Sequence, residues 1–259
     1  MTEFLLESRG SHVRVLRING EARLNTLRRT MLDELETHVR ALEADADVRV
    51  VIITGSGPIA FCAGADLRER QAMDVAQVRV WLADLKRVFL AIERSRRVYV
   101  AAINGAAMGG GCELALACDL RVADPAAQLG LPEVKLGILP GAGGTVRLAR
   151  VVGLGRARDL ILTGRRVSAA EALAMGLVNR LAPPRESLAE ALALAEEIAA
   201  NAPVAVAEAK ASLREGWDCD LETALDREHV AYEPLLATAD RLEGLAAFAE
   251  KRKPKYIGR

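Results

Sequence analysis

Two short runs of apolar, mostly β-branched residues constrain the fold of this chain most strongly. The first covers residues 50–53 and is followed by Gly55, and the second covers residues 98–103 and ends at Asn104. Neither run alternates with polar residues, which is typical of a strand buried on both faces of a sheet. We therefore expect a sheet that is covered on both sides.

Helical patterns lie between the expected strands. One helix is indicated by apolar residues at spacings of three and four, namely Leu27, Met31, Leu35, Val39 and Leu42, which is the pattern of an amphipathic helix. A second helix is expected over residues 75–92, and shorter strands around residues 13–18 and 120–122. Strands that alternate with helices predict the α/β class.

The last quarter of the chain has a different character. Beyond residue 188 no strand is expected, and Ala-rich segments predict helices over residues 188–200, 203–215, 219–234 and 238–250. We place a boundary near residue 195, with a core over residues 1–195 and an all-helical region over residues 196–259. A helical appendage of this kind often serves packing or assembly.

Composition excludes several classes of protein. Lys plus Arg and Asp plus Glu number 35 each, so no net field attracts nucleic acid or an anionic membrane. The four cysteines form no C-x-x-C pair and the three histidines are scattered, which argues against a zinc site and a disulfide framework. Glu3 and Glu7 and the absence of a basic leader argue against a signal peptide, so we expect a cytoplasmic protein without a membrane span.

Glycine-rich turns recur in four segments, over residues 61–67, 104–114, 130–133 and 140–145. In the second segment a strand leads through Gly109–Gly111 into a helix-like run. Glycines let the backbone approach a ligand, and a helix N-terminus offers free N–H groups to negative charge. The first segment repeats this pattern, with a helix expected near Asp66, so two N–H groups from two turns would hold one carbonyl oxygen as an oxyanion. Tight packing is the alternative role for such turns.

Glu113 and Glu133 stand in apolar, glycine-rich surroundings about 20 residues apart. A single glutamate at a helix start is usually a capping or solvated residue. Two glutamates that share an apolar cleft can instead have different pKa values and divide acid and base roles. No dinucleotide fingerprint, P-loop or G-x-S-x-G motif is present, so nucleotide-binding and serine-nucleophile chemistry are not indicated.

At these four segments the sequence closely resembles the enoyl-CoA hydratase (crotonase) family. The likeness extends over nearly the whole chain and includes residues 24–27, 162–164 and 174–178. The resemblance implies a spiral of ββα turns with a helical C-terminal oligomerisation region, assembled as a homotrimer or as a hexamer made of two trimers. It also implies an acyl-CoA substrate and no metal or other cofactor.

The resemblance assigns roles to particular positions. Glu113 and Glu133 align with the two catalytic glutamates, Glu113 activating the water and Glu133 delivering a proton to C2. The N–H groups of Ala65 and Gly110 would form the oxyanion hole. The positions expected to bind coenzyme A are Arg23, Leu24, Ala63, Asp66, Leu67, Phe248 and Lys251, the last two contributed by a neighbouring subunit. The acyl pocket is expected to include Met73, Trp81, Leu82, Pro132 and Gly141.

Within the family, residues 61–70, 113–119 and 240–252 are most similar to methylglutaconyl-CoA hydratases. This favours hydration of 3-methylglutaconyl-CoA in leucine breakdown. A general short-chain enoyl-CoA hydratase of fatty-acid oxidation shares every catalytic position and is the alternative. RNA binding is a second alternative, but the early helix carries both charges, from Arg28 to Arg40, so we expect it to be weak. A non-catalytic scaffold is a third, and retention of both glutamates argues against it.

Overall fold

The two apolar runs become the central strands of a six-stranded sheet. The structure is a computed structural model and describes residues 2–259. The strand order is β1-β2-β3-β5-β7-β10, and these strands are β1 (Phe4–Arg9), β2 (Val13–Ile18), β3 (Val50–Gly55), β5 (Val98–Ile103), β7 (Leu120–Ala123) and β10 (Arg180–Leu181). β1 and β2 are antiparallel, and the other neighbours are parallel.

Both faces of this sheet are buried, as the sequence predicts. In β3, Val51 and Ile53 point into one hydrophobic core, while Val50 and Ile52 point into the other. β5 divides its side chains in the same way. Because successive side chains of a strand point to opposite faces, a strand between two cores must be apolar at every position, which explains the absence of alternation.

A second, smaller sheet has the order β4-β6-β8-β9. Its strands are β4 (Ala60–Cys62), β6 (Ala106–Met108), β8 (Gln128–Gly130) and β9 (Arg166–Ser168). The chain places β3 in the large sheet and β4 in the small one, then forms helices, and repeats this with β5 and β6 and again with β7 and β8. This repetition is a spiral of ββα turns, and it stacks the ends of β4, β6 and β8 side by side.

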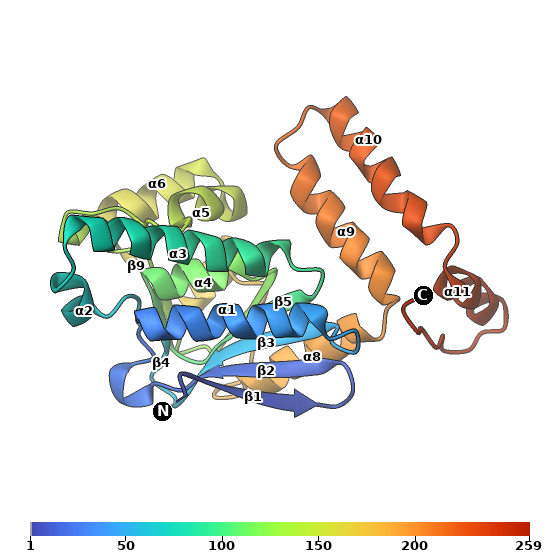
Figure 1. Cartoon of the computed structure of the whole chain (residues 1–259), viewed down its shortest axis with the longest axis horizontal. Helices are drawn as coiled ribbons and strands as arrows, with labels where there is room; N and C mark the ends of the chain where they lie inside the picture. Colours follow the sequence, from blue (N-terminus) through green and yellow to red (C-terminus); the bar gives the residue numbers. More distant parts are fainter. Residues whose placement is uncertain (1) are drawn as a thin grey trace.

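Helices cover the sheets on both sides (Figure 1). α1 (Arg29–Ala44), α3 (Val75–Arg94) and α4 (Gly110–Ala117) contribute to the larger core, and α8 (Ser187–Ala199) packs on the opposite face of the six-stranded sheet. The remaining short helices of this part are η1 (Glu21–Arg23), α2 (Leu67–Gln71), η2 (Glu133–Leu136), α5 (Gly144–Val152), α6 (Leu154–Thr163) and α7 (Ala169–Ala174). The helices predicted over residues 27–42 and 75–92 are therefore present as α1 and α3.

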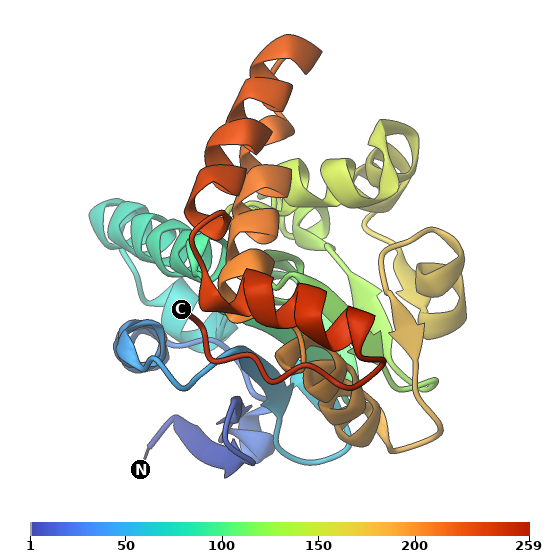
Figure 2. The ribbon, with the colours of Figure 1, turned by 90° about the vertical axis from the view of Figure 1, so that its right-hand side faces the viewer.

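The C-terminal region is helical. It comprises α9 (Pro203–Gly216), α10 (Leu221–Tyr232), η3 (Glu233–Leu235) and α11 (Ala239–Ala249). α9 and α10 form a hairpin that projects from the rest of the chain (Figures 1 and 2). Lys210, midway along α9, ties the hairpin to the core, because its Nζ donates to Asp119 Oδ2 at 2.8 Å. The boundary expected at residue 195 falls inside α8, and α8 packs on the sheet through Ala191, Leu194 and Ala195. By its contacts with the sheet, α8 as a whole belongs with the preceding part of the chain, and the helical region follows it.

Among residues 2–259, no helix is both long enough and apolar enough to cross a membrane.

The first turn of α4 lies unusually close to β4. A Cβ on Gly111 would collide with the carbonyl oxygen of Cys62. We expect Gly111→Ala to lower the free energy of unfolding by about 1–3 kcal/mol, because the added methyl group overpacks this contact. Gly155→Ala in α6 is the matched control, since no atom lies within 4 Å of its Cβ position, and a helical alanine gains up to about 1 kcal/mol over glycine. Urea unfolding measures both, and equal effects would contradict the packing argument.

Candidate active site

Two glycine turns meet at one edge of the small sheet. β4 and β6 are parallel neighbours, so the turns that follow them lie next to each other. A Cβ built on Gly110 would lie 3.8 Å from the nitrogen of Ala65, and one built on Gly64 would lie 3.6 Å from the nitrogen of Gly110. The structure therefore brings together the two N–H groups that the sequence predicts as an oxyanion hole.

Both N–H groups are available to a ligand. Leu27 pairs with the backbone on either side of Ala65: its N–H donates to Gly64 O at 2.8 Å, and its carbonyl accepts from Asp66 N at 2.9 Å. This bridge fixes Ala65 without using its N–H. Within residues 2–259, neither Ala65 N nor Gly110 N donates to a protein acceptor. Gly110 also begins α4, so the positive end of the helix dipole adds to the attraction for an anionic oxygen.

Glu113 lies in the first turn of α4 and is buried. Its Oε1 accepts two backbone hydrogen bonds of 2.7 Å, from Ala142 N and Gly144 N. The pKa of Glu113 is raised above its ordinary value, because the effect of burial outweighs the lowering effects of the two N–H groups and the nearby Arg147. Hydrogen bonds to one oxygen stabilise the ionised carboxylate and fix its orientation, and Oε2 accepts no hydrogen bond within the described residues.

Glu133 is the first residue of η2 and is also buried, 9% exposed. Neither of its carboxyl oxygens has a hydrogen-bond partner within residues 2–259. The pKa of Glu133 is raised to about 7, mainly by burial and also by the charge of Glu113, against a lowering effect of its own backbone. Its Oε1 would lie 3.2 Å from a Cβ on Gly109, so the carboxyl group faces the turn that contains Gly110, one of the two expected oxyanion donors.

These groups together suit one kind of chemistry. One carboxyl group is oriented by two N–H groups, the other has no hydrogen-bond partner within residues 2–259 and a pKa raised to about 7, and two further N–H groups are placed to stabilise an anionic oxygen. This arrangement can add a water molecule across a double bond conjugated to a carbonyl, or remove one. Within residues 2–259 no group of three or more His, Cys, Asp or Glu side chains forms a metal site.

The expected coenzyme-A positions fall at two places. Arg23, Leu24, Ala63, Asp66 and Leu67 lie near the oxyanion turns, and Ala63 N donates to Leu24 O at 3.0 Å. Leu24 and Leu67 are 43% and 60% exposed. The carboxylate of Asp66 caps α2 by accepting from the N–H groups of two residues within it, and Arg23 pairs with Glu3 at 2.8 Å.

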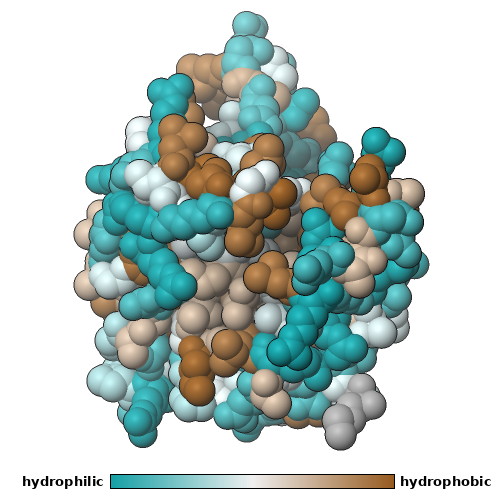
Figure 3. All heavy atoms as spheres, turned by 90° about the vertical axis from the view of Figure 1, so that its left-hand side faces the viewer, coloured by the Kyte–Doolittle hydropathy of each residue, from teal (hydrophilic) through white to brown (hydrophobic). Residues whose placement is uncertain are grey.

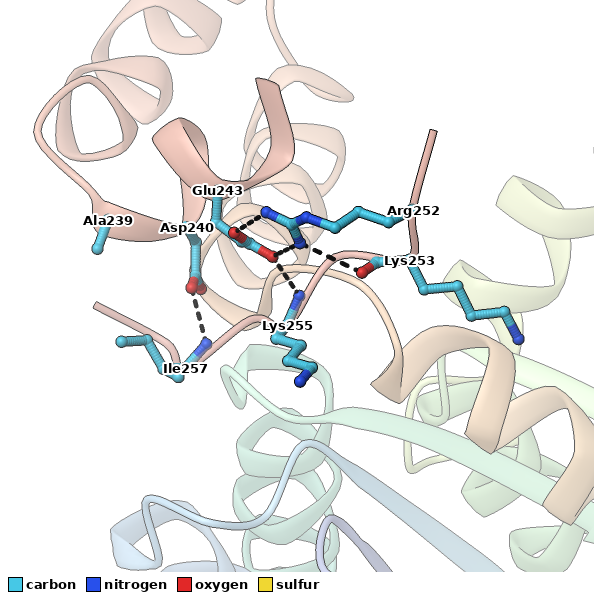
Figure 4. A pocket seen from close by; sticks show the side chains of 7 residues that line it. All are labelled: Ala239, Asp240, Glu243, Arg252, Lys253, Lys255 and Ile257. Carbon is cyan, nitrogen blue, oxygen red and sulfur yellow. Dashed lines mark hydrogen bonds and ion pairs between the residues drawn. The ribbon is translucent and has the colours of Figure 1, made fainter. Parts of the chain in front are cut away.

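Phe248 and Lys251 lie elsewhere. Phe248 is on α11 and 87% exposed, and α11 is at the opposite end of the molecule from α2 (Figure 1). A cavity of about 610 Å³ adjoins this segment (Figure 4). Its charged groups hold the C-terminal tail, because Glu243 pairs with Arg252 and Asp240 accepts from the N–H of Ile257. One chain therefore does not bring Phe248 and Lys251 to the glutamates.

The expected acyl-pocket residues divide into two groups: Leu82, Gly141 and Pro132 lie beside the Ala142–Gly144 turn or Glu133, whereas Met73 and Trp81 pack against or within the main core. Leu82 and Gly141 are in contact, since a Cβ on Gly141 would lie 2.8 Å from Leu82 Cδ2, and Pro132 directly precedes Glu133. Met73 is half-buried against the main core. Trp81 is 2% exposed and lies in that core among large apolar side chains, where its role is to pack α3.

The face at the left of Figure 1, near α2, is hollowed in the middle (Figure 3). The surface of the hollow is pale to brown, and hydrophilic side chains flank it. A thioester with an apolar acyl group and a charged carrier would meet both kinds of surface on such a face.

Sequence reasoning missed the groups that hold Glu113. The segment over residues 140–145 was singled out for its glycines, but nothing in the sequence indicated that Ala142 and Gly144 donate to a carboxylate 29 and 31 residues earlier. Asn25 was also assigned no role of its own, yet it is 1% exposed and donates to the carbonyl oxygens of Ser56 and Ala60. Its positive φ of 56°, which asparagine tolerates better than most residues, carries no signal in the sequence.

The early helix considered for RNA binding, α1, carries charges that form ion pairs. In α1, Arg40 pairs with Glu36 at 2.6 Å, and Arg28, which precedes the helix, lies 3.5 Å from Glu3. The weakness of RNA binding stays a prediction.

Comparison with known proteins agrees with this geometry. The sequence model of the family described as enoyl-CoA hydratase/isomerase matches residues 8–259. The chain is 42% identical over 253 residues to a short-chain-enoyl-CoA hydratase of Clostridium acetobutylicum, covering 98% of this chain and 97% of that protein. It is 42% identical over 257 residues to a mitochondrial methylglutaconyl-CoA hydratase of Rattus norvegicus, covering 98% and 82%. A crystal structure of an enoyl-CoA hydratase from Bacillus anthracis superimposes with a TM-score of 0.98 at 46% identity over the full length of both chains.

The chain belongs to the enoyl-CoA hydratase/isomerase family. The crotonase-type ββα spiral with its helical C-terminal region is confirmed. The activity is that of an enoyl-CoA hydratase, a hydro-lyase.

The unpartnered carboxyl group of Glu133 makes stability depend on pH. Its pKa is about 7 in the folded state against 4.5 ordinarily, so between these values the folded chain holds a proton that the unfolded chain releases. Stability from this group is therefore present below about pH 4.5 and is lost as the pH rises through 7.

We expect Glu133→Gln, which cannot ionise, to gain stability relative to the unchanged chain as the pH rises from about 5 to about 8, by at most about 3 kcal/mol. Thermal and urea unfolding across this range measure the difference. Glu196→Gln, at an exposed position of α8, is the control that should show no such trend. A constant difference for Glu133→Gln would contradict the raised pKa.

Proposed function

We propose that Glu113 acts as the base and Glu133 as the acid in the hydration of an enoyl-CoA thioester. One observation carries this proposal: two buried carboxyl groups face the same site, but within residues 2–259 only Glu113 accepts hydrogen bonds from the protein. The difference favours an ionised Glu113 and a protonated Glu133 near neutral pH.

The reaction then follows from the positions of these groups. The thioester carbonyl accepts from Ala65 N and Gly110 N, which polarises the C2=C3 bond. A water molecule bound by the free oxygen of Glu113 gives up a proton to it and attacks C3, while negative charge moves to the carbonyl oxygen. Glu133 gives its proton to C2 as the carbonyl re-forms. The same steps in reverse remove water.

We expect Glu113→Gln and Glu133→Gln each to lower kcat by at least about 100-fold, within the range ascribed to positioned proton transfer. Loss of conjugated enoyl-thioester absorbance with crotonyl-CoA measures the rate. Neither substitution changes the size of the side chain appreciably, so folding is checked by circular dichroism. Undiminished activity of either variant would show that the roles are assigned incorrectly.

For the substrate we propose 3-methylglutaconyl-CoA. Both types of relative share 42% identity with this chain, so identity does not discriminate between them. Arg70 supports the diacid: it is a half-buried cation on α2 that has no carboxylate partner within residues 2–259, and its Nη1 lies 3.5 Å from Met73 Sδ at the expected acyl pocket. Burial lowers the pKa of Arg70, which a substrate carboxylate would reverse.

We expect Arg70→Met to lower kcat/KM for 3-methylglutaconyl-CoA by about 10- to 100-fold, the worth of a hydrogen bond to a charged group, and to leave crotonyl-CoA hydration unchanged. Arg68→Met, an exposed cation on the same helix, is the control. If the unchanged chain prefers crotonyl-CoA, the alternative of a general short-chain hydratase replaces this proposal.

We also propose that the chain assembles as a trimer or a hexamer through its C-terminal helices. Supporting this, large apolar side chains on the projecting helices are exposed, including Leu213 at 78%, Leu221 at 75% and Val230 at 72%. Assembly would cover these groups and would bring Phe248 and Lys251 to a neighbour's site. The mass of the intact chain by light scattering checks this, and a stable monomer would contradict it.

A further inference from the structure

The turn that binds Glu113 rests on an arginine on its other side. Ala142 and Gly144 direct their N–H groups to Glu113, while the carbonyl oxygen of Ala142 accepts from Arg147 Nη1 at 2.8 Å. Arg147 lies on α5, less than one turn after Gly144. The turn is thus held between a carboxylate on one side and a guanidinium on the other.

Arg147 is itself fixed by α3. Its Nε and Nη2 donate to Glu93 Oε2 at 3.0 and 2.6 Å, and the two side chains are 12% and 26% exposed. All three donating nitrogens of the guanidinium are therefore occupied, two by Glu93 and one by the turn. Charge-assisted hydrogen bonds from two nitrogens of one guanidinium are stronger and more directional than a neutral hydrogen bond.

Gly143 shows that the turn and the guanidinium are fitted to each other. Its φ is +105°, and a Cβ at this position would collide with Arg147 Nη1. The glycine therefore permits both the backbone conformation that presents the N–H groups and the close approach of the arginine beneath it.

The surroundings of the pair are charged. A cleft of about 560 Å³ lies on this side of the turn, and besides Glu93 and Arg147 its charged lining consists of Lys86, Arg94, Arg150, Arg214, Glu215, Asp218 and Arg227. Arg150 pairs with Asp218 and Arg214 with Glu215. Arg147 is the charged side chain that lowers the pKa of Glu113, and Glu113 in turn raises the pKa of Glu133.

We propose that Glu93 and Arg147 form a positioning pair for Glu113: they hold the Ala142–Gly144 turn so that it directs the carboxylate, and Arg147 favours its ionised form. The proposal rests on the proposed role of Glu113 as the base. Arg147 does not touch the reacting atoms and acts through the turn. Two effects follow from its loss, a less well oriented carboxylate and a base that is harder to ionise.

Arg147→Gln, Arg147→Lys and Glu93→Gln test the pair, with Arg150→Gln as the control on the same helix, because its ion pair is exposed. For Arg147→Gln we expect kcat to fall about 10- to 100-fold, as small misplacements of a catalytic group do, with KM changed much less. The acidic limb of the kcat/KM profile should move to higher pH, since removing the cation raises the pKa of a carboxylate.

Arg147→Lys keeps the positive charge but loses the planar set of three N–H donors. The acidic limb of its kcat/KM profile should therefore stay in place, while its kcat should lie between those of the unchanged chain and Arg147→Gln. Glu93→Gln should lower kcat, and combining it with Arg147→Gln should cost less than the sum of the two. Arg150→Gln should change neither quantity. Thermal melting verifies that each variant is folded.

Two results would overturn the inference: a kcat for Arg147→Gln close to that of the unchanged chain, or a fall in kcat with no movement of the acidic limb, which is what a purely structural role produces. Glu113→Gln separates this failure from that of the proposed function. If Glu113→Gln loses its activity while Arg147→Gln keeps a kcat close to that of the unchanged chain, only the positioning pair is wrong. If Glu113→Gln is fully active, the proposed base is wrong.

Discussion

The geometry of this site depends on one interaction, the pair of backbone hydrogen bonds that Glu113 accepts from Ala142 and Gly144. A buried carboxylate is unfavourable unless it is hydrogen-bonded, and these two donors come from a turn far along the chain. For the carboxylate to reach them, α4 must begin close to β4, which Gly111 permits. The segment that donates these hydrogen bonds needs glycine at two positions. A side chain at Gly143 would collide with Arg147, and one at Gly144 would closely approach Glu113 itself.

Glu133 shows what the same burial does without partners. Burial raises the pKa of both glutamates, but within residues 2–259 only Glu113 has N–H groups directed at it, and the pKa of Glu133 is raised to about 7. The fold thus places two identical side chains in different hydrogen-bonding environments. Ala65 and Gly110, the proposed oxyanion donors, follow the neighbouring strands β4 and β6, so the small sheet places these N–H groups beside the glutamates proposed to exchange protons.

Much of the fold was predictable because its signals are local. The buried strands β3 and β5 are apolar at every position, and the buried stripes of α1 and α3 repeat with the helical period. The small sheet was not predictable from residue patterns, because β4, β6, β8 and β9 have three residues each, too few to show a period. The end of the sheet-containing part was hard to locate for a similar reason. α8 is as rich in alanine as the helices after it, and only its packing on the six-stranded sheet distinguishes it from them.

The candidate site was predictable in its reactive groups and not in what tunes them. Glu113, Glu133, Ala65 and Gly110 follow from motifs and resemblance, and the structure places them around one point. The partners of Glu113, and the arginine behind them, come from contacts between distant segments that no local pattern indicates. The proposed division of acid and base roles between the two glutamates is of this second kind, since it would arise from burial and hydrogen bonding in the folded chain.

The most direct test of the account is to titrate the two glutamates themselves. The protein would be labelled with carbon-13 at the side-chain carboxyl of glutamate and followed by NMR, with Glu113→Gln and Glu133→Gln to assign the signals. The account predicts one carboxyl group that titrates near pH 7, is absent in Glu133→Gln, and moves to lower pH in Glu113→Gln as a neighbouring negative charge is removed. If the signals lost in the two variants both titrate near the ordinary glutamate value of 4.5, the division of acid and base roles by environment is contradicted.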